Sequence, residues 1–139
     1  MTAPCAKCGH DPEARITALW SFHVHRDPPS LNARLFNGQR GWMYRKERDA
    51  WVSEFRAVRL LQRIPKAVGK RRVTLTRNYA GRQQLRDRDN LAGGMKACVD
   101  ALVIEGVIAN DDAIGAEIHY AQARTTPPGL HVLVEELAS

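Results

Sequence analysis

Five side chains in the second half of the chain have the types and spacing needed to hydrolyse a phosphodiester bond. Asp87 and Asp89 are two residues apart, and Asp111 and Asp112 are adjacent. In an extended segment the first two carboxylates point to the same side and can reach one cation. Mg²⁺ takes a few carboxylates together with waters and substrate phosphates, and it stabilises the oxygens that attack and leave phosphorus. Lys96 is the candidate for stabilising charge on the phosphate itself.

Structural roles also explain each of these residues. Asp89 or Asn90 alone is a suitable helix N-cap, and Asp111-Asp112 alone is a typical turn sequence. Lys96 and Asp100 lie four apart in a predicted helix and are expected to pair at its surface. Spacing by itself therefore leaves a metal site and a set of structural carboxylates both open.

The charge is divided unevenly along the 139 residues, whose formal net charge is +6. Residues 31–86 hold 15 Lys and Arg against three acids, whereas residues 87–139 hold nine acids against three bases. A basic stretch can follow a phosphate backbone and release its condensed counterions. A solvated surface explains the same charges, so charge alone does not decide between the two.

Composition excludes several classes of protein. The length suits one domain with its own core. No apolar run approaches the roughly 18 residues of a membrane helix, and residues 1–10 lack a secretory signal pattern. Three cysteines are too few for a disulfide framework. We expect a soluble, cytoplasmic, basic protein with no membrane partner.

The hydrophobic pattern predicts one α+β domain, with a small mixed β-sheet and two main helices, over residues 16–139. Residues 1–15 are expected to form an arm that contains cysteines. Strands are predicted at 16–25, 73–77, 116–123 and 130–136, helices at 44–61 and 90–105, and loops at 31–42 and 78–85. The first acidic pair then lies where the second helix begins, and the second pair lies after that helix ends at Gly106. Gly93-Gly94 is expected to weaken the first turn of the second helix.

The order of these motifs resembles the RusA family of Holliday junction resolvases. The matching segments are Arg86-Asp87-Arg88-Asp89-Asn90-Leu91, Lys96-x-x-x-Asp100-Ala101-Leu102, Gly106-Val107-Ile108 and Asp111-Asp112. An earlier segment, Asp27-Pro28-Pro29-Ser30-Leu31-Asn32, is similar to the end of the family's N-terminal strand. The resemblance spans residues 16–137. The stretch 92–95 is longer than in the family, so Lys96 is matched by its spacing to Asp100.

The resemblance implies a homodimeric, Mg²⁺-dependent endodeoxyribonuclease of bacterial or phage origin. Such an enzyme resolves four-way DNA junctions by paired symmetric cuts in DNA recombination and repair, and Mn²⁺ is expected to substitute for Mg²⁺. Asp87, Asp89 and Asp112 would bind the metal with Asp111 as an accessory ligand, Lys96 would be the catalytic lysine, and Arg86 would contact DNA. Two alternatives stay open, namely a nuclease for flaps or other branched DNA, and a branched-DNA-binding protein without catalysis.

The basic stretch predicts further DNA contacts. The candidates for phosphate binding are Arg40, Lys70, Arg71, Arg72 and Arg77. Trp42, beside Arg40 in a basic loop, is the candidate for stacking on a base. Trp51 fits the apolar stripe of the predicted helix, which favours a place in the core.

The N-terminal arm contains part of a zinc-binding pattern. Cys5 and Cys8 have the spacing of one half of a zinc site, and His10 is close enough to be a third ligand. His23 and His25 on the first strand are further candidates. A tail without bound metal explains the same residues.

Overall fold

The computed structural model describes residues 15–30, 41–81 and 85–138. The elements are β1 (Ile16–Val24), α2 (Gly41–Gln62), β2 (Arg71–Tyr79), α3 (Arg88–Gly94), α4 (Lys96–Ile104), β3 (Ala116–Arg124) and β4 (Gly129–Leu137). This confirms the predicted α+β class. All four predicted strands are present, and the first predicted helix begins at Gly41, within the predicted loop.

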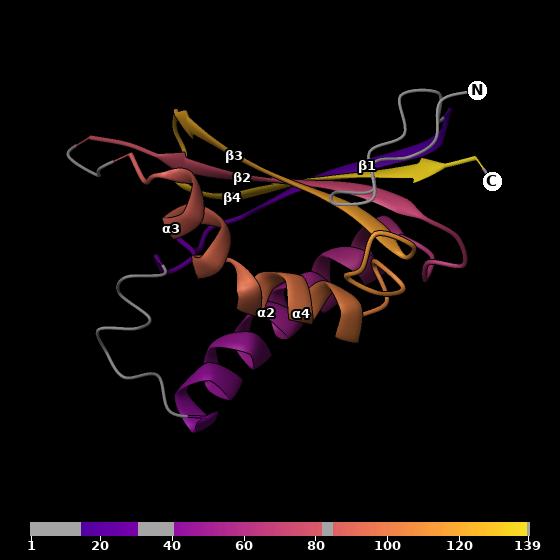
Figure 1. Cartoon of the computed structure of the whole chain (residues 1–139), viewed down its shortest axis with the longest axis horizontal. Coiled ribbons are helices and arrows are strands. Elements are labelled where there is room, and N and C mark those ends of the chain that lie inside the picture. The colour runs from indigo at the N-terminus through magenta and orange to yellow at the C-terminus, as the bar shows by residue number, and fades with distance from the viewer. Residues whose placement is uncertain (1–14, 31–40, 82–84, 139) are drawn as a thin grey trace.

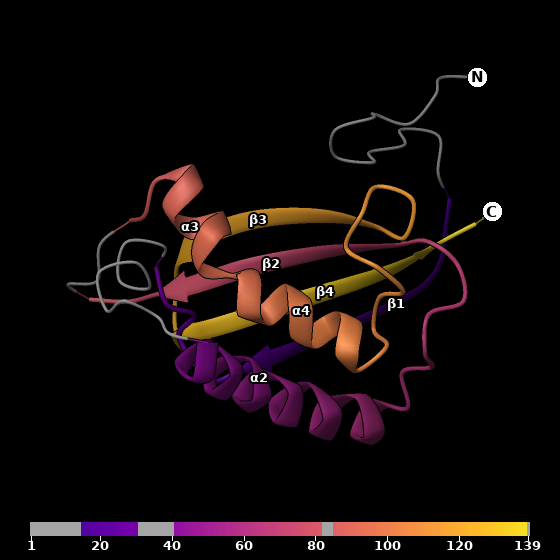
Figure 2. The ribbon, with the colours of Figure 1, turned by 60° about the horizontal axis from the view of Figure 1, so that its bottom comes forward.

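The four strands form one mixed sheet in the order β1-β4-β2-β3. β4 is antiparallel to both β1 and β2, whereas β2 and β3 are parallel. A parallel pair needs a crossover connection, and α3 with α4 provides it. Figure 1 shows that all the helices lie on one face of the sheet. Figure 2 shows α4 running across the middle strands and α2 beside β1.

The hydrophobic core lies between the helices and this face of the sheet. Alternate residues of β2, including Val73 and Leu75, are fully buried, as expected for a strand with one covered face. Trp51 and Phe55 of α2 are also fully buried, and their ring centroids are 5.7 Å apart. Burying a large apolar side chain stabilises the fold by about 1.5–3 kcal/mol. The core thus fixes α2 against the sheet.

The predicted helix over 90–105 is two helices, α3 and α4, separated at Met95. Met95 is fully buried, and its φ of −90° and ψ of 7° depart from helical values. Just before this break, a Cβ atom at Gly94 would lie 1.9 Å from the carbonyl oxygen of Pro29, so only glycine permits the close approach of the two segments. The glycine pair therefore does more than weaken a helical turn. Gly94 lets α3 pack directly on the segment that follows β1.

Within the described ranges, no helix is both long and apolar enough to cross a membrane.

Candidate active site

A polar network anchors the segment that leads into Asp87. Arg86 donates one hydrogen bond to Asp27 Oδ2 at 3.1 Å and another to the carbonyl oxygen of Pro28 at 2.6 Å. Arg77 donates to the other oxygen of Asp27 at 3.0 Å. Since Asp27 follows β1 and Arg77 lies in β2, the network joins three distant parts of the chain.

Gln122 of β3 completes the network. Its side-chain oxygen accepts from the backbone N–H of Arg86 at 3.0 Å, and its side-chain nitrogen donates to the carbonyl oxygen of Arg86 at 2.6 Å. Burial lowers the pKa of Arg86, as does the nearby charge of Arg77, while Asp27 opposes the shift. No pattern in the sequence singled out Gln122, and Asp27 was noted only as part of the segment that ends the first strand.

The surroundings of Arg86 differ from those expected for a residue that contacts DNA. Its side chain is 12% exposed, and its guanidinium is engaged within the protein. These bonds to Asp27 and Pro28 favour a role of Arg86 in positioning the chain before Asp87, and its contact with DNA stays a prediction.

Asp87 is the N-cap of α3. Its Oδ1 accepts from the backbone N–H of Asn90 at 2.8 Å. The helix thus begins at Arg88, and Asp89 lies in its first turn. The condition under which Asp87 and Asp89 would share one side, an extended segment, is not met, because Asp87 is extended but Asp89 is helical. Both carboxylates are exposed, and Asp89 has no hydrogen-bond or ion-pair partner among the described residues.

Lys96 is the first residue of α4 and is held by Asp100. Its Nζ lies 3.3 Å from Asp100 Oδ2, and the same oxygen accepts the hydroxyl of Tyr44 from α2. Lys96 Nζ also lies 6.0 Å from the centroid of the Tyr44 ring. The predicted pairing of Lys96 with Asp100 is confirmed. The contribution of Tyr44 was missed, although the sequence placed it at the start of the first helix.

Asp111 and Asp112 lie on the loop between α4 and β3 and have different surroundings. Asp112 Oδ1 accepts from the backbone N–H groups of Ile114 and Gly115, at 3.1 and 2.8 Å, and its Oδ2 accepts from Asn110 at 3.0 Å. Asp112 thus organises its own turn, as the structural interpretation expects. Asp111 is exposed. Burial of Tyr120 is the largest cause of the raised pKa of that residue, and the charges of Cys98 and Asp111 raise the pKa further.

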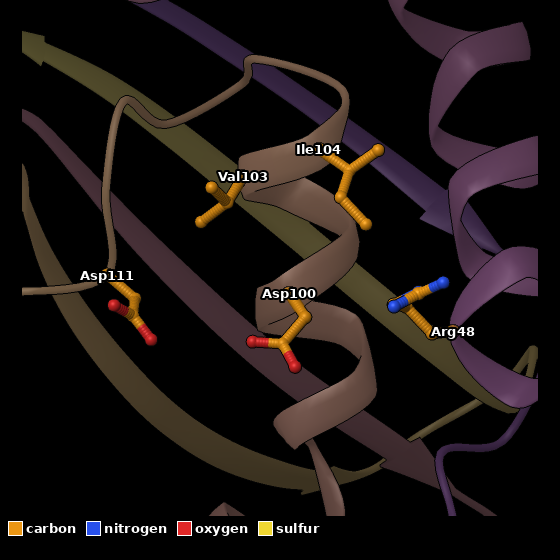
Figure 3. A pocket seen from close by; sticks show the side chains of 5 residues that line it. All are labelled: Arg48, Asp100, Val103, Ile104 and Asp111. Carbon is orange, nitrogen blue, oxygen red and sulfur yellow. The ribbon is translucent and has the colours of Figure 1, made fainter. Parts of the chain in front are cut away.

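A shallow cavity of about 260 Å³ lies between α2, α4 and this loop. Its lining residues are Arg48, Asp100, Val103, Ile104 and Asp111. Figure 3 shows the carboxylates of Asp100 and Asp111 pointing toward one another, with Arg48 on the opposite side of α4. Asp100 therefore lines this cavity, whereas the sequence analysis considered it only as the partner of Lys96 at a helix surface.

The structure does not gather the predicted metal ligands into one cluster. Within residues 15–30, 41–81 and 85–138, no three His, Cys, Asp or Glu side chains form a group that could hold a metal ion. Mg²⁺ does not require such a cage, because it keeps several waters and binds one or two carboxylates together with substrate phosphates. The exposed, oxygen-donating side chains of Asp87 and Asp89 fit that kind of open site. The full ligand set stays a prediction from the motif.

Three of the predicted phosphate-binding residues, all in β2, form ion pairs within the protein. Arg71 is fully buried and pairs with Glu136, and Arg77 is almost as buried and pairs with Asp27, which follows β1. Arg72 lies 3.0 Å from the fully buried carboxylate of Glu117. The burial of Arg71 and Arg77 does not favour contact with a phosphate, and their assignment to DNA stays a prediction.

Three other basic residues are exposed. Arg45 and Lys46 lie in the first turns of α2, and Arg88 is the first residue of α3. A count of basic residues in the sequence did not separate these exposed side chains from the buried arginines.

The remaining predicted site residues are placed as follows. Lys70 is partly exposed, immediately before β2. Cys5, Cys8, His10 and Arg40 lie outside the described residues. His23 and His25 are described, and their ring centroids are 4.6 Å apart.

No protein-family model matches the sequence, and no curated protein matches it.

Proposed function

We propose that the chain is an endodeoxyribonuclease of the RusA type that cuts branched DNA, foremost four-way junctions. One observation carries the proposal. The exposed pair Asp87 and Asp89 lies where one helix begins, and the exposed Lys96 begins the next. The largely buried Arg86, bonded to Asp27 and to the Pro28 carbonyl oxygen, fixes the segment that leads into them. A fold that commits buried polar groups to hold exposed carboxylates is typical of a functional site.

The chemistry proposed for this site is hydrolysis, in which water adds across a phosphodiester P–O bond. Mg²⁺ held by Asp87 and Asp89, with Asp111 and Asp112 as further candidate ligands, would stabilise charge on the attacking and leaving oxygens. Asp87 retains its cap through Oδ1, so it offers its other oxygen. Lys96 stabilises negative charge on the phosphate oxygens.

Asp100 and Tyr44 are positioning residues in this proposal. Asp100 accepts hydrogen bonds from both Lys96 and Tyr44, so it connects α4 to α2. A lysine side chain has several rotatable bonds, and a fixed carboxylate reduces the number of positions that its ammonium samples. The ammonium is thereby kept near the N-terminus of α4.

The exposed basic residues support binding to a phosphate backbone. Arg45, Lys46 and Arg88 are available for phosphate contacts, in place of the buried arginines of β2. Binding through such contacts weakens as salt rises, because release of the condensed counterions into a more concentrated solution gains less entropy. The shape of the branch point then supplies the selectivity.

We further propose that the active form is a homodimer with two-fold symmetry. A four-way junction presents two equivalent strands, and a symmetric dimer presents two equal sites to them. Sedimentation analysis with and without junction DNA tests this, and a monomer in both conditions contradicts it.

A second candidate function is branched-DNA binding without catalysis. The structural roles of Asp87, as a helix cap, and of Asp112, as a turn-organising residue, favour it. The two candidates make opposite predictions about metal dependence.

The test is a panel of end-labelled substrates, namely an immobile four-way junction, a flap, a Y-fork and a matched linear duplex. Each is incubated with the protein in Mg²⁺, in Mn²⁺ and in EDTA. We expect paired symmetric nicks in the junction that need metal, with the duplex left intact. Preferred cutting of the flap or fork makes the chain a nuclease of different specificity, and junction binding without cutting in either metal supports the second candidate.

A further inference from the structure

A second cavity lies on the side of α2 that is turned away from Asp100. Its volume is about 360 Å³, and its lining residues are Arg26, Trp42, Met43, Lys46, Glu47 and Ala50. We call it the Trp42 pocket. Binding sites for small ligands have volumes of about 300–1,000 Å³. The Trp42 pocket is at the lower end of that range, which suits one flat aromatic group rather than a large ligand.

Trp42 is unusual among the tryptophans of the chain. Its side chain is 57% exposed, whereas Trp51 is fully buried and Trp20 is partly buried against the core. The guanidinium carbon of Arg71 lies 4.9 Å from the Trp20 ring centroid, so that ring already has a charged partner. A large exposed aromatic ring beside a cavity is suited to stacking with another ring.

The charge of the pocket favours an anionic ligand. Glu47 is already neutralised, since one of its oxygens accepts from Arg26 at 2.7 Å and the other accepts from Trp51 Nε1 at 3.0 Å. Lys46 is exposed and adds a positive charge that this pair does not balance. In the described part of the chain, Arg26 Nε is the one buried side-chain nitrogen or oxygen without a hydrogen-bond partner. The pocket thus combines a ring, an apolar wall and a surplus of cationic donors.

We propose that the Trp42 pocket receives one unpaired nucleobase of branched DNA. The base stacks on Trp42 and packs against Met43 and Ala50, while its flanking phosphate lies by Lys46. A neutral planar ligand could stack on the Trp42 ring but would leave the positive charge of the pocket without a partner. Proteins that bind single-stranded nucleic acid combine an aromatic stacking surface with positive charge. The proposal rests on the proposed function, because it takes the branch point as the source of the unpaired base.

The position of the pocket agrees with this role. Trp42 and Lys46 are four residues apart on α2, and Tyr44, which contacts Asp100, lies between them in sequence. The first two turns of α2 therefore carry the pocket on one flank and the contact to the lysine site on the other. A base held on one flank would therefore lie on the same helix as the contact that positions Lys96.

The experiment compares two four-way junctions that differ only at the branch point, where one has intact nucleotides and the other abasic sites. Binding is measured for the full-length protein and for Trp42→Ala and Trp42→Phe. We expect the unsubstituted protein to bind the intact junction about 5- to 100-fold more tightly than the abasic one, as for one base–aromatic stack. Trp42→Ala removes that difference, and Trp42→Phe preserves most of it.

Leu61→Ala is the matched control, because Leu61 is exposed on the other end of the same helix. This control is expected to keep the preference for the intact junction. Equal binding of both junctions by the unsubstituted protein, or a preference that survives in Trp42→Ala, overturns the pocket. Metal-dependent cutting is measured on the same samples. If the protein cuts the junction but shows no preference for the intact branch point, only the proposal of base binding in the Trp42 pocket is contradicted. If a Trp42-dependent preference is found without cutting, only the proposed nuclease activity is contradicted.

Discussion

Arg86 Nη2 lies 3.1 Å from Asp27 Oδ2, and this ion pair joins the end of β1 to the segment that carries Asp87. The side chain of Arg86 is largely buried, and its other terminal nitrogen is bonded to the Pro28 carbonyl oxygen. Because these partners use its donors, we expect the Arg86 guanidinium not to contact a phosphate. The basic residue next to the acidic motif therefore acts on the position of a carboxylate.

Replacement of Arg86 by Gln tests this assignment through the salt dependence of binding. The variant loses its ion pair with Asp27, so we expect the free energy of unfolding to fall by about 1–3 kcal/mol and cutting to weaken. The slope of log affinity against log salt concentration is expected to match that of the unsubstituted protein, because no phosphate contact is lost. Junction titrations at four salt concentrations measure it.

Arg45→Gln is the control for that measurement. Arg45 is exposed on α2, so its loss is expected to reduce the magnitude of the salt slope by about 0.9 with little effect on stability. A reduced slope in Arg86→Gln instead of in Arg45→Gln assigns the phosphate contact to Arg86 and contradicts our account.

Gly94→Ala tests the contact between α3 and the end of β1. In an exposed helix this substitution stabilises by up to about 1 kcal/mol. Here the added Cβ meets the Pro29 carbonyl oxygen, so we expect destabilisation by about 1–3 kcal/mol. Gly69→Ala is the control, because a Cβ at Gly69 has no atom within 4 Å. Denaturant unfolding measures the change in the free energy of unfolding. If Gly94→Ala stabilises the protein, the close approach of Gly94 to Pro29 is contradicted.

Asp100→Asn tests the positioning of Lys96. Loss of the carboxylate removes the partner of the ammonium, so we expect a lower kcat with junction affinity nearly unchanged. Lys96→Ala is expected to lower kcat further. Combining the two changes is then expected to add little beyond Lys96→Ala, because both act through the same ammonium. Full additivity in single-turnover measurements shows that Asp100 acts independently of Lys96.

The stability of the protein is expected to depend on pH through Glu105, and the environment of this carboxyl sets the direction of that dependence. Burial raises the pKa of this carboxyl, but hydrogen bonds from Arg56 and Arg59 outweigh it and bring the pKa below its usual 4.5. A lowered pKa in the folded state stabilises the protein above the pKa of the unfolded state, and the benefit is lost as pH falls through the folded value.

Glu105→Gln is therefore expected to lower the free energy of unfolding by about 1–3 kcal/mol at pH 7. The difference from the unsubstituted protein shrinks as the pH falls below 4.5. Glu54→Gln, at an exposed position of α2, is expected to show no such trend. Denaturant unfolding between pH 3 and 7 measures both variants, and a difference that stays constant with pH contradicts the assignment.

The sequence predicted most of the fold because the strands and helices have clear periodicity. The alternation of Val73 and Leu75 with polar residues predicted β2, and the stripe through Trp51 and Phe55 predicted α2. It did not predict the break at Met95, because the apolar stripe continues across it. The break lies next to the tertiary contact of Gly94 with Pro29, which no local pattern shows.

The candidate site was predicted in part. Spacing indicated the Lys96–Asp100 pair, which is local, and it identified the acidic residues themselves. The network around Arg86 could not be predicted, because Asp27 and Gln122 are brought to it by strand order. For the same reason, a count of arginines did not separate the buried Arg71 and Arg77 from the exposed Arg45.

The central claim is that the exposed carboxylates of α3 bind the metal that cutting requires. The most direct test is cleavage and binding of an immobile four-way junction in Mg²⁺ by Asp87→Asn and Asp89→Asn. Asparagine is itself a good N-cap, so Asp87→Asn keeps α3 intact while removing the charge. Asp49→Asn, an exposed acid on α2, is the control.

We expect both α3 variants to bind the junction with nearly unchanged affinity and to lose cutting, while Asp49→Asn cuts normally. Cutting that persists in Asp89→Asn, or an absence of metal-dependent cutting by the unsubstituted protein, contradicts the account.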